Sequence, residues 1–434
     1  MGLGCSCQCS RAQELQGELT AEHVKSGGAV GFAQSETFVD VLPRDDGARS
    51  PLAVGGNFKQ ALEISPTTCS TQEPPASLPS PTQADSASRI ADDDVAADPE
   101  RVLATIKELC GEGRIFEAAA ALQDLTTKVD VSTESGKSVK AQIDTDPMLA
   151  NLREMHARMK TTMEIITPEA LPGQSHDSRW VHTRVQEKSI GPQFLSDIYL
   201  RFAQGKERDP KGSSTQLVIC GYLQAFPCEL DKFISVYRET DLYMKEWIAD
   251  CERSEGQVHG IENLFAAMSH IVNASPILPM KLQVVSIRNF AVCSQSPFNA
   301  QLPDRGPGVL VMDFGVPADA TKHAGFDLPQ HVHRAVRLAG MSMILYFTPR
   351  ADLPGHCDVF AFGKTGVPVP QWLVPLSLLK RFLSHHFLSV FIAIKTHIVN
   401  NWDSLAYAER MQNCPTFYRA AGAPSLAAAP AVAP

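Results

Sequence analysis

The feature that most constrains this chain is a long apolar stripe near its C-terminal end. After Pro375, apolar residues recur every three or four positions; they are Leu376, Leu379, Leu383, Phe387, Val390, Ile394 and Ile398. This spacing places them along one side of an α-helix. A helix with a wide apolar side must bury that side against another layer of structure.

The segments that precede this helix alternate polar and apolar residues, as strands with one buried face do. These segments are Trp180–Glu187, Phe194–Phe202, Thr215–Ala225, Lys281–Val292, Val309–Val316, Ser342–Thr348 and Cys357–Phe362. Between them the pattern predicts one helix around Cys228–Tyr243 and a second near Ile261–Val272. Strands followed by one long helix predict an α+β domain whose antiparallel sheet wraps around that helix.

The part of the chain before this domain has two different compositions. Residues 11–97 are poor in aromatic side chains and include a Pro/Ser/Thr-rich stretch, which predicts a disordered linker. From Pro99, apolar residues at helical spacing predict three helices, at 99–110, 115–125 and 149–166. The expected organisation is 1–10 anchor, 11–97 linker, 98–167 helical lead-in, 168–404 α+β domain, and 405–434 C-terminal extension with a disordered tail.

The first ten residues match the acceptor pattern for N-terminal myristate, M-G-x-x-x-[ST], with Gly2 as the acylated residue. A single myristoyl chain binds a bilayer weakly, so stable anchoring needs a second signal. Cys5, Cys7 and Cys9 are the candidate palmitate acceptors, since few basic residues lie nearby. A zinc site in this C-x-C-x-C run is the weaker interpretation, because a fourth ligand is not close by.

Charge and hydropathy exclude two classes of protein. The chain has 39 Lys and Arg against 48 Asp and Glu, a net charge of −9, which argues against a nucleic-acid partner. The best candidate for a membrane span, Phe387–Ile394, is far shorter than the roughly 18 residues that a span needs. We therefore expect a peripheral, lipid-anchored protein on the cytoplasmic face of a membrane, which leaves room for a cytosolic pool.

Three groups of residues in the α+β region occur in a characteristic order. The first runs from Phe226-Pro227-Cys228 to Leu242-Tyr243 and Trp247, and the second is Gly308–Phe314. The third combines Val336–Gly340, Tyr346–Pro349, Cys357–Phe360 and Gly366-Val367-Pro368-Val369-Pro370-Gln371-Trp372-Leu373, in that order. Together they resemble a START-type (steroidogenic acute regulatory protein-related) lipid-transfer domain, and the resemblance covers about 175–402.

The resemblance implies a helix-grip fold, in which a curved antiparallel sheet and a C-terminal helix enclose an apolar tunnel for one lipid. The implied tunnel residues are Asp313, Arg337, Met343, Tyr346, Trp372, Leu379 and Leu383. Residues 294–307 fall where the family has a lid loop, and Phe298 and Leu302 would be its membrane-touching points. Relatives bind sterols, phospholipids, ceramides or carotenoids, so the implied partner is a lipid ligand.

Other chemistry has weaker support. Gly363-Lys364-Thr365 lacks the earlier glycine of a phosphate-binding loop, since Asp358 stands there. A metal site built on His331 and His333, with His323, His356 or Cys357, is the weaker interpretation. The simpler one is that these histidines lie in loops and bind no metal. We expect neither a metal nor a cofactor, and we expect that the protein is not an enzyme.

The sequence thus predicts non-catalytic lipid binding or intermembrane lipid transfer by a membrane-tethered START-like domain. One alternative is a lipid-sensing signalling or scaffold module, in which helices 99–166 engage a protein partner. Another is an enzyme of the helix-grip group, which would need a titratable group inside the tunnel with a strongly shifted pKa. Lipid identity, target membrane and oligomeric state stay open.

Overall fold

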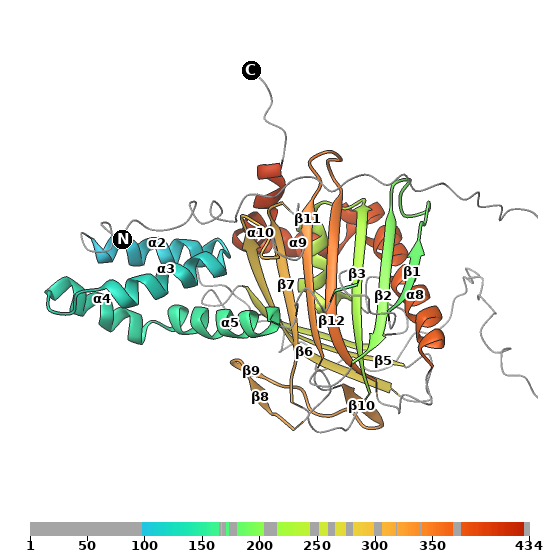
Figure 1. Ribbon diagram of the computed structural model, residues 1–434, viewed down its shortest axis with the longest axis horizontal. Helices are drawn as coiled ribbons and strands as arrows, with labels where there is room; N and C mark the ends of the chain where they lie inside the picture. Colours follow the sequence, from blue (N-terminus) through green and yellow to red (C-terminus); the bar gives the residue numbers. More distant parts are fainter. Residues whose placement is uncertain are drawn as a thin grey trace, which may run out of the picture. The chain divides into compact units, whose positions relative to one another are not determined.

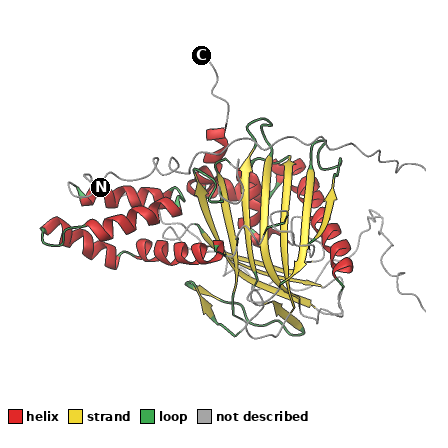
Figure 2. Cartoon of the chain, in the orientation of Figure 1, coloured by secondary structure: helices red, strands yellow, loops and turns green. Residues whose placement is uncertain are grey.

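A computed structural model of the chain describes most residues between 98 and 428, all within one compact unit. The described ranges are 98–164, 166, 171–172, 180–203, 215–243, 251–258, 265–274, 281–298, 306–317, 319–338, 341–367 and 375–428. Figure 2 shows that they form a large sheet with helices beside and behind it. The α+β class that the sequence predicts is confirmed.

Within the described residues, one ten-stranded sheet has the order β1-β2-β3-β12-β11-β7-β6-β5-β4, and all neighbours in that order are antiparallel. A short tenth strand, β10 (Ala335–Leu338), runs parallel to β6, and β8 (Lys322–His323) pairs with β9 (Phe326–Asp327) separately. The other strands are β1 Val181–Val185, β2 Leu195–Phe202, β3 Thr215–Phe226, β4 Cys251–Val258, β5 Ala266–Ala274, β6 Lys281–Cys293, β7 Gly308–Gly315, β11 Ser342–Pro349 and β12 Cys357–Val367. The seven strands expected from alternation are all present.

Strand register defines two faces of the sheet. One row of paired residues runs across six strands, namely Ile198, Gly221, Ala361, Leu345, Val311 and Phe290. We call the face that carries this row the inner face and the opposite one the outer face. Because side chains alternate along a strand, every second residue from this row also belongs to the inner face.

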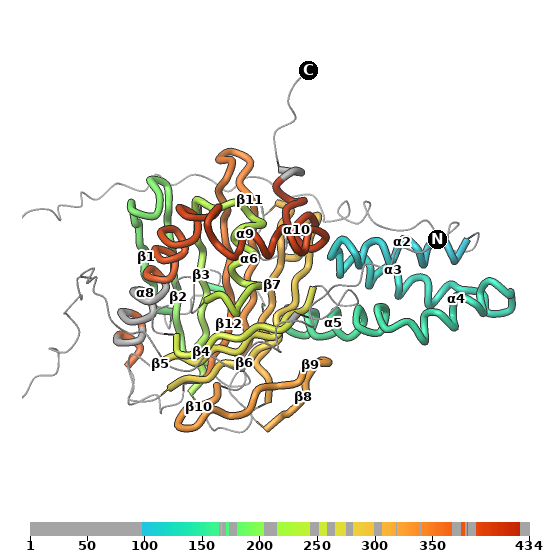
Figure 3. Tube along the Cα trace, turned by 180° about the vertical axis from the view of Figure 1, so that it is seen from behind, coloured from blue at the N-terminus to red at the C-terminus, as the bar shows by residue number. Residues whose placement is uncertain are grey.

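Four helices lie on the side of the inner face, and three of them contact the sheet. They are α6 (Leu230–Arg238), α8 (Leu376–Ala393), α9 (Ala406–Asn413) and α10 (Pro415–Ala428). α8 contacts β1 and β2, α6 contacts β11, α10 contacts β6, β7, β11 and α6, and α9 packs on α6 and α10. These helices lie behind the strands in Figure 1 and in front of them in Figure 3, seen from the other side. The long amphipathic helix expected after Pro375 is therefore present and packs on the sheet.

The helical lead-in has four helices rather than three. They are α2 (Pro99–Gly111), α3 (Ile115–Lys128), α4 (Glu134–Thr145) and α5 (Pro147–Met163). The additional helix, α4, falls in a stretch too polar to show periodicity, yet Val139 and Ile143 are fully buried. Its start is marked by Thr133, whose hydroxyl accepts a hydrogen bond from the Gly136 backbone.

The prediction of a helix near Ile261–Val272 is wrong, because most of the described part of this segment belongs to strand β5. The first five side chains of this strand are all buried, so both of its faces are covered there. A short run that is buried on both sides lacks the alternation of a half-exposed strand. The sequence analysis also did not predict strand β4, which precedes β5.

The C-terminal extension expected within 405–434 is helical as far as Ala428, since α9 and α10 occupy most of 406–428. Phe417 and Tyr418 are buried at the sheet and explain why this Ala-rich segment is ordered. Their partners lie more than a hundred residues earlier, so local composition does not reveal the contact.

The lead-in docks on the sheet through Gly113, the residue between α2 and α3. The Val292 amide donates a hydrogen bond of 2.8 Å to the Gly113 carbonyl, and Ser294 donates to Glu117 at 2.7 Å. Gly113 has a φ of +71°, and a Cβ there would overlap the Phe265 ring.

We expect Gly113→Ala to lower the free energy of unfolding by about 2–4 kcal/mol, since left-handed strain and overpacking add. Urea denaturation followed by tryptophan fluorescence measures this change. Gly111→Ala is the matched control, because a Cβ at Gly111 has no atom within 4 Å and the site is helical. Equal effects of the two substitutions would contradict the docking role of Gly113.

Candidate functional site

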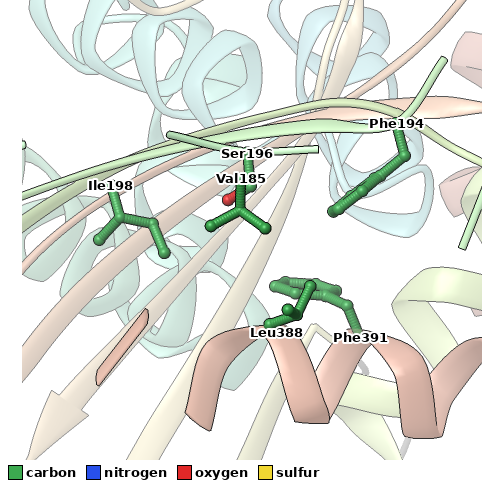
Figure 4. Close-up of a pocket in the computed structure, with 6 residues that line it drawn as sticks. All are labelled: Val185, Phe194, Ser196, Ile198, Leu388 and Phe391. Carbon is green, nitrogen blue, oxygen red and sulfur yellow. The ribbon is translucent and has the colours of Figure 1, made fainter. Parts of the chain in front are cut away.

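A cleft lies between α8 and the part of the inner face formed by β1 and β2. It is lined by Val185, Phe194, Ser196, Ile198, Leu388 and Phe391, whose side chains leave no room for a water molecule between them. Figure 4 shows Leu388 and Phe391 on the helix facing the side chains of the strands. Apart from the Ser196 hydroxyl, the lining is apolar.

The two sequence periods explain how these side chains meet. Ser196 and Ile198 are two residues apart on β2, and Val185 pairs with Ser196 across the ladder, so all three share the inner face. Leu388 and Phe391 are three residues apart on α8, which puts them on one side of the helix. The cleft therefore lies where the inner face of the sheet meets one side of the α8 helix.

Aromatic side chains close one end of this cleft. The Phe391 ring centroid lies 5.5 Å from that of Phe226 and 6.4 Å from those of Phe194 and Phe233. Phe233 on α6 also contacts Phe347 on β11, at 5.0 Å. This aromatic cluster joins α8, α6 and the sheet, and it separates the cleft from a polar region on the same face.

The polar region is built on a buried ion pair. Arg288 Nε donates to Asp313 Oδ1 at 2.7 Å, and both side chains are less than a tenth exposed. Burial works against the charge of Arg288, but the adjacent Asp313 carboxylate outweighs it and raises the pKa of Arg288. The guanidinium therefore stays protonated.

Arg288 also ties the end of α6 to the sheet. Its Nη1, which carries two N–H groups, lies within hydrogen-bond distance of three oxygens: the Tyr237 carbonyl, the Thr240 hydroxyl at 3.1 Å and the Tyr243 hydroxyl at 2.9 Å. The Tyr237 carbonyl belongs to the last turn of α6, where carbonyls lack partners within the helix. The ion pair thus holds α6 in place on β6 and β7.

Sequence analysis found Asp313 but missed Arg288. The signal was present, because Arg288 and Asp313 each stand among buried residues of a strand. Two opposite charges on neighbouring strands can neutralise each other, but their register is not visible in the sequence.

Of the other residues implied by the resemblance, Met343 and Arg337 occupy different places. Met343 pairs with Asp313 and Gly363 and is on the inner face. Arg337 lies on β10 opposite Gln283, five positions along β6 from Arg288, or about 16 Å. The structure therefore does not bring Arg337 and Asp313 together.

The structure places Tyr346 and Phe298 on the outer face, whereas the tunnel that the resemblance implies would lie between the inner face and α8. Tyr346 alternates with Leu345, so it points away from the inner face, and its hydroxyl donates to the Gly306 carbonyl at 2.7 Å. Phe298 is 1% exposed and packs on Tyr346 and Phe360, with centroids 5.8 and 5.6 Å away. Phe298 and Gly306, at the described ends of the expected lid loop, therefore both contact the outer face. The prediction for Tyr346 was wrong because neighbouring residues of a strand point to opposite faces.

Other predicted positions lie outside the part of the chain that the structure describes. Gly2, Cys5, Cys7, Cys9, Leu302 and Trp372 lie outside the described residues. Leu379 and Leu383 are part of α8, but their side chains lie outside the described set.

The described residues offer little for covalent or metal chemistry. They contain no group of three or more His, Cys, Asp or Glu side chains arranged to hold a metal ion. Burial raises the pKa of the Cys110 thiol to about 11 and of the Cys220 and Cys293 thiols to about 12, so these thiols stay protonated at neutral pH. Among the helices that can be described, none has the length and hydropathy to cross a bilayer.

Comparison with known proteins finds similar solved structures, whereas no family model and no curated protein matches the sequence. Human STARD10 has a TM-score of 0.37 at 11% identity and covers 58% of this chain and 84% of its own. Human StAR-related lipid transfer protein 5 has a TM-score of 0.36 at 8% identity, covering 58% and 97%. A StAR-related lipid transfer protein from Xanthomonas axonopodis has a TM-score of 0.32 at 16% identity, covering 46% and 90%.

These structures are StAR-related proteins, the group that the sequence motifs resemble. Their identities and TM-scores are low, so the argument about function rests on the residues of this chain.

We expect Arg288→Met to lower the free energy of unfolding by about 3–5 kcal/mol, because it leaves the Asp313 carboxylate buried without its counter-ion. The double variant Arg288→Met/Asp313→Leu should recover a large part of this loss. Urea titration of both variants measures it. Lys322→Met is the control, since its ion pair with Asp327 is exposed and worth less than about 1 kcal/mol. A loss below about 1 kcal/mol for Arg288→Met would contradict the proposed role of the pair.

Proposed function

We propose that this protein binds one lipid between α8 and the inner face and exchanges it with membranes, without a covalent step. The observation that supports this most directly is the apolar cleft under α8, at the seam between the helix and the sheet. An apolar space with a few polar groups is the usual form of a small-molecule site.

The size of the cleft indicates how a lipid would enter. The cleft has no room for a water molecule, whereas a typical ligand pocket holds ~300–1,000 Å³, so α8 must move away from β1 and β2 as the lipid enters. The side chains that this movement separates are apolar, and apolar groups of the lipid then pack against them. Burying roughly 500 Å² of lipid at about 25 cal/mol/Å² gains on the order of 12 kcal/mol before association costs.

The charges on the inner face favour a ligand whose buried part is uncharged. Of the strand residues described on this face, only Arg288 and Asp313 carry charge, and each neutralises the other. A phosphate brought into the site would have no free counter-ion on these strands, and a buried unpaired charge is costly. The Ser196 hydroxyl can instead form a hydrogen bond with a neutral group.

The same residues argue against the enzyme alternative. Asp313 is bonded to a guanidinium that also ties down α6, so it cannot act as a base without breaking that contact. The buried thiols at Cys220 and Cys293 are protonated at neutral pH. Asp313 and these thiols are therefore unsuited to acid–base or nucleophilic work.

A test of lipid binding uses the full chain, purified from eukaryotic cells and analysed by native mass spectrometry. We expect one uncharged lipid per chain, and uptake of cholesterol or ceramide from phosphatidylcholine vesicles that contain either one. Bound phosphatidylcholine alone would contradict the uncharged ligand but not lipid binding. A protein that stays empty in every case would contradict the function itself.

Filling the cleft should reduce binding. We expect Leu388→Trp to weaken uptake about tenfold, or about 1.4 kcal/mol, since the larger ring occupies space that the lipid needs. Ser389→Trp is the matched control, on the neighbouring exposed position of α8. Vesicle-exchange assays measure both, and equal uptake by the two variants would place the lipid elsewhere.

We further propose that acyl chains on the N-terminal segment hold this domain on a cytoplasmic leaflet. The support is the acceptor pattern at Gly2 together with Cys5, Cys7 and Cys9. Two acyl signals hold a protein on a bilayer where one does not. The residues between this segment and Pro99 would act as the tether.

Gly2→Ala should abolish incorporation of labelled myristate and move the full chain from the membrane fraction to the soluble fraction. Replacing Cys5, Cys7 and Cys9 by serine should keep myristate but give the same release. Membrane retention of Gly2→Ala equal to wild type would contradict the tether, and lipid uptake by the soluble variant would show that binding is independent of it.

A further inference from the structure

The chain between β7 and β11 lies on the outer face of the sheet and includes β8, β9 and β10. We call residues 319–338 the outer segment; Figure 1 shows its three short strands together at the lower end of the sheet. Phe326 of β9 is 2% exposed and packs on an apolar group of β5 and β6 that contains Met268, Val285 and Ile287. Val285 and Ile287 are each an odd number of residues from Phe290, so this group belongs to the outer face.

A glutamine side chain of β6 holds the outer segment by its backbone. Gln283 is fully buried, its Oε1 accepts a hydrogen bond of 3.1 Å from the Val332 amide, and its Nε2 donates to the Gln330 carbonyl at 2.9 Å. A backbone amide can only donate and a backbone carbonyl can only accept. These two bonds therefore fix which end of the Gln283 side chain is oxygen and which is nitrogen. We call the two bonds the Gln283 clamp.

The remaining N–H of Gln283 fixes the protonation state of a buried histidine. Nε2 of His270, on β5, lies 3.1 Å from Gln283 Nε2, and the ring is fully buried. Because Gln283 Nε2 can only donate, His270 Nε2 must accept and carries no proton. The proton of the neutral ring is then on Nδ1, which donates to Glu255 Oε2 on β4 at 2.9 Å. The Gln283 clamp thus requires the neutral form of His270.

A second proton on His270 is incompatible with the Gln283 clamp. The Nε2–H of the imidazolium and the N–H of Gln283 would face each other, two donors without an acceptor. Turning the Gln283 side chain over gives His270 an acceptor, but it also sets Nε2 against the Val332 N–H and Oε1 against the Gln330 carbonyl. Both bonds of the clamp are then lost, whereas the bond from His270 Nδ1 to Glu255 is kept.

From this geometry we infer that His270 and Gln283 form a proton-sensitive latch, which holds the outer segment on the sheet while His270 is neutral and releases residues 330–332 when His270 is protonated. Histidine is the side chain that most often changes its charge between pH 5 and 8. His270 is the sensor, and Gln283 is the positioning residue that passes its state to the backbone. The latch does not depend on the proposed function.

Several other charged groups surround the latch. On β4, Arg253 Nε lies 3.8 Å from Glu255 Oε1, and Glu252 pairs with Lys281 of β6 at 2.5 Å. On β10, Arg337 is opposite Gln283 in the parallel ladder. The other titratable or charged side chains of the outer segment are Asp319, Lys322, His323, Asp327, His331, His333 and Arg334. Those of His331 and His333 are exposed, so these two histidines serve as controls for an effect of pH outside the latch.

Hydrogen–deuterium exchange of the full chain at pH 7.5 and pH 5.5 tests the latch, with each rate divided by the intrinsic rate at that pH. We expect the protection of amides in 328–335 to fall about tenfold at pH 5.5, because the bonds that hold this stretch are lost. Protection in α2, which contains no histidine, should change less than about twofold. Equal protection of 328–335 at the two pH values, or an equal loss in α2, would overturn the latch.

A variant at position 270 separates the sensor from the other histidines. His270→Gln offers a permanent acceptor to Gln283 and takes up no proton in this pH range, so protection of 328–335 should not fall at pH 5.5. The double variant His331→Gln/His333→Gln is the matched control and should keep the wild-type loss. A loss in His270→Gln equal to that of wild type would overturn the role of His270.

A variant at position 283 tests the clamp and covers the case in which His270→Gln does not fold. Gln283→Met keeps a side chain of similar length but removes both bonds to the backbone of the outer segment. Protection of 328–335 should then be low at both pH values, as in the wild type at pH 5.5. A Gln283→Met protein that still loses about tenfold between the two pH values would show that acid acts elsewhere, and would overturn the latch.

Discussion

A guanidinium group lies inside this fold, and the packing of the inner face depends on how its charge is satisfied. Arg288 could not be buried alone, because an unpaired charge in the interior is too costly. Asp313 on the next strand neutralises it, and Tyr237, Thr240 and Tyr243 use donors of its Nη1. Since these last three lie in α6 and just beyond it, satisfying the charge also fixes α6 on the sheet. The apolar cleft in which we propose that a lipid binds lies on the α8 side.

Much of the fold follows from local periods in the sequence. Alternation identified seven of the strands, and the stripe from Leu376 to Ile398 identified the helix that covers them. Both signals are strong because apolar residues recur on one face of each of these elements, whereas the other face has a different composition. Cleft residues such as Ser196 and Leu388 were within those elements, although nothing in the sequence said that these two would face each other. Elements buried on both sides, such as β5, gave no comparable signal.

The site residues were harder to predict because their roles depend on register. Tyr346 and Leu345 are neighbours, yet they lie on opposite faces, and the sequence alone does not say which one faces the helices. The burial of Arg288 is explained by Asp313, which lies 25 residues later in the chain and directly opposite in the ladder. The position of α10 depends on contacts between Phe417 and residues about 130 to 150 positions earlier. Such pairings are properties of the folded chain.

Two kinds of contact thus hold helices on the same face of the sheet. At α6 and α10, buried carboxylates and guanidinium groups meet in fixed geometry, and a lipid chain could not replace those hydrogen bonds. At α8, the cleft is closed by side chains such as Leu388 and Phe391, whose contacts an acyl chain or a sterol ring can take over without leaving a polar group unpaired. Under the proposed function, a lipid therefore displaces α8 while the contacts of α6 and α10 stay intact. The site would then open to a membrane and close again without unfolding of the domain.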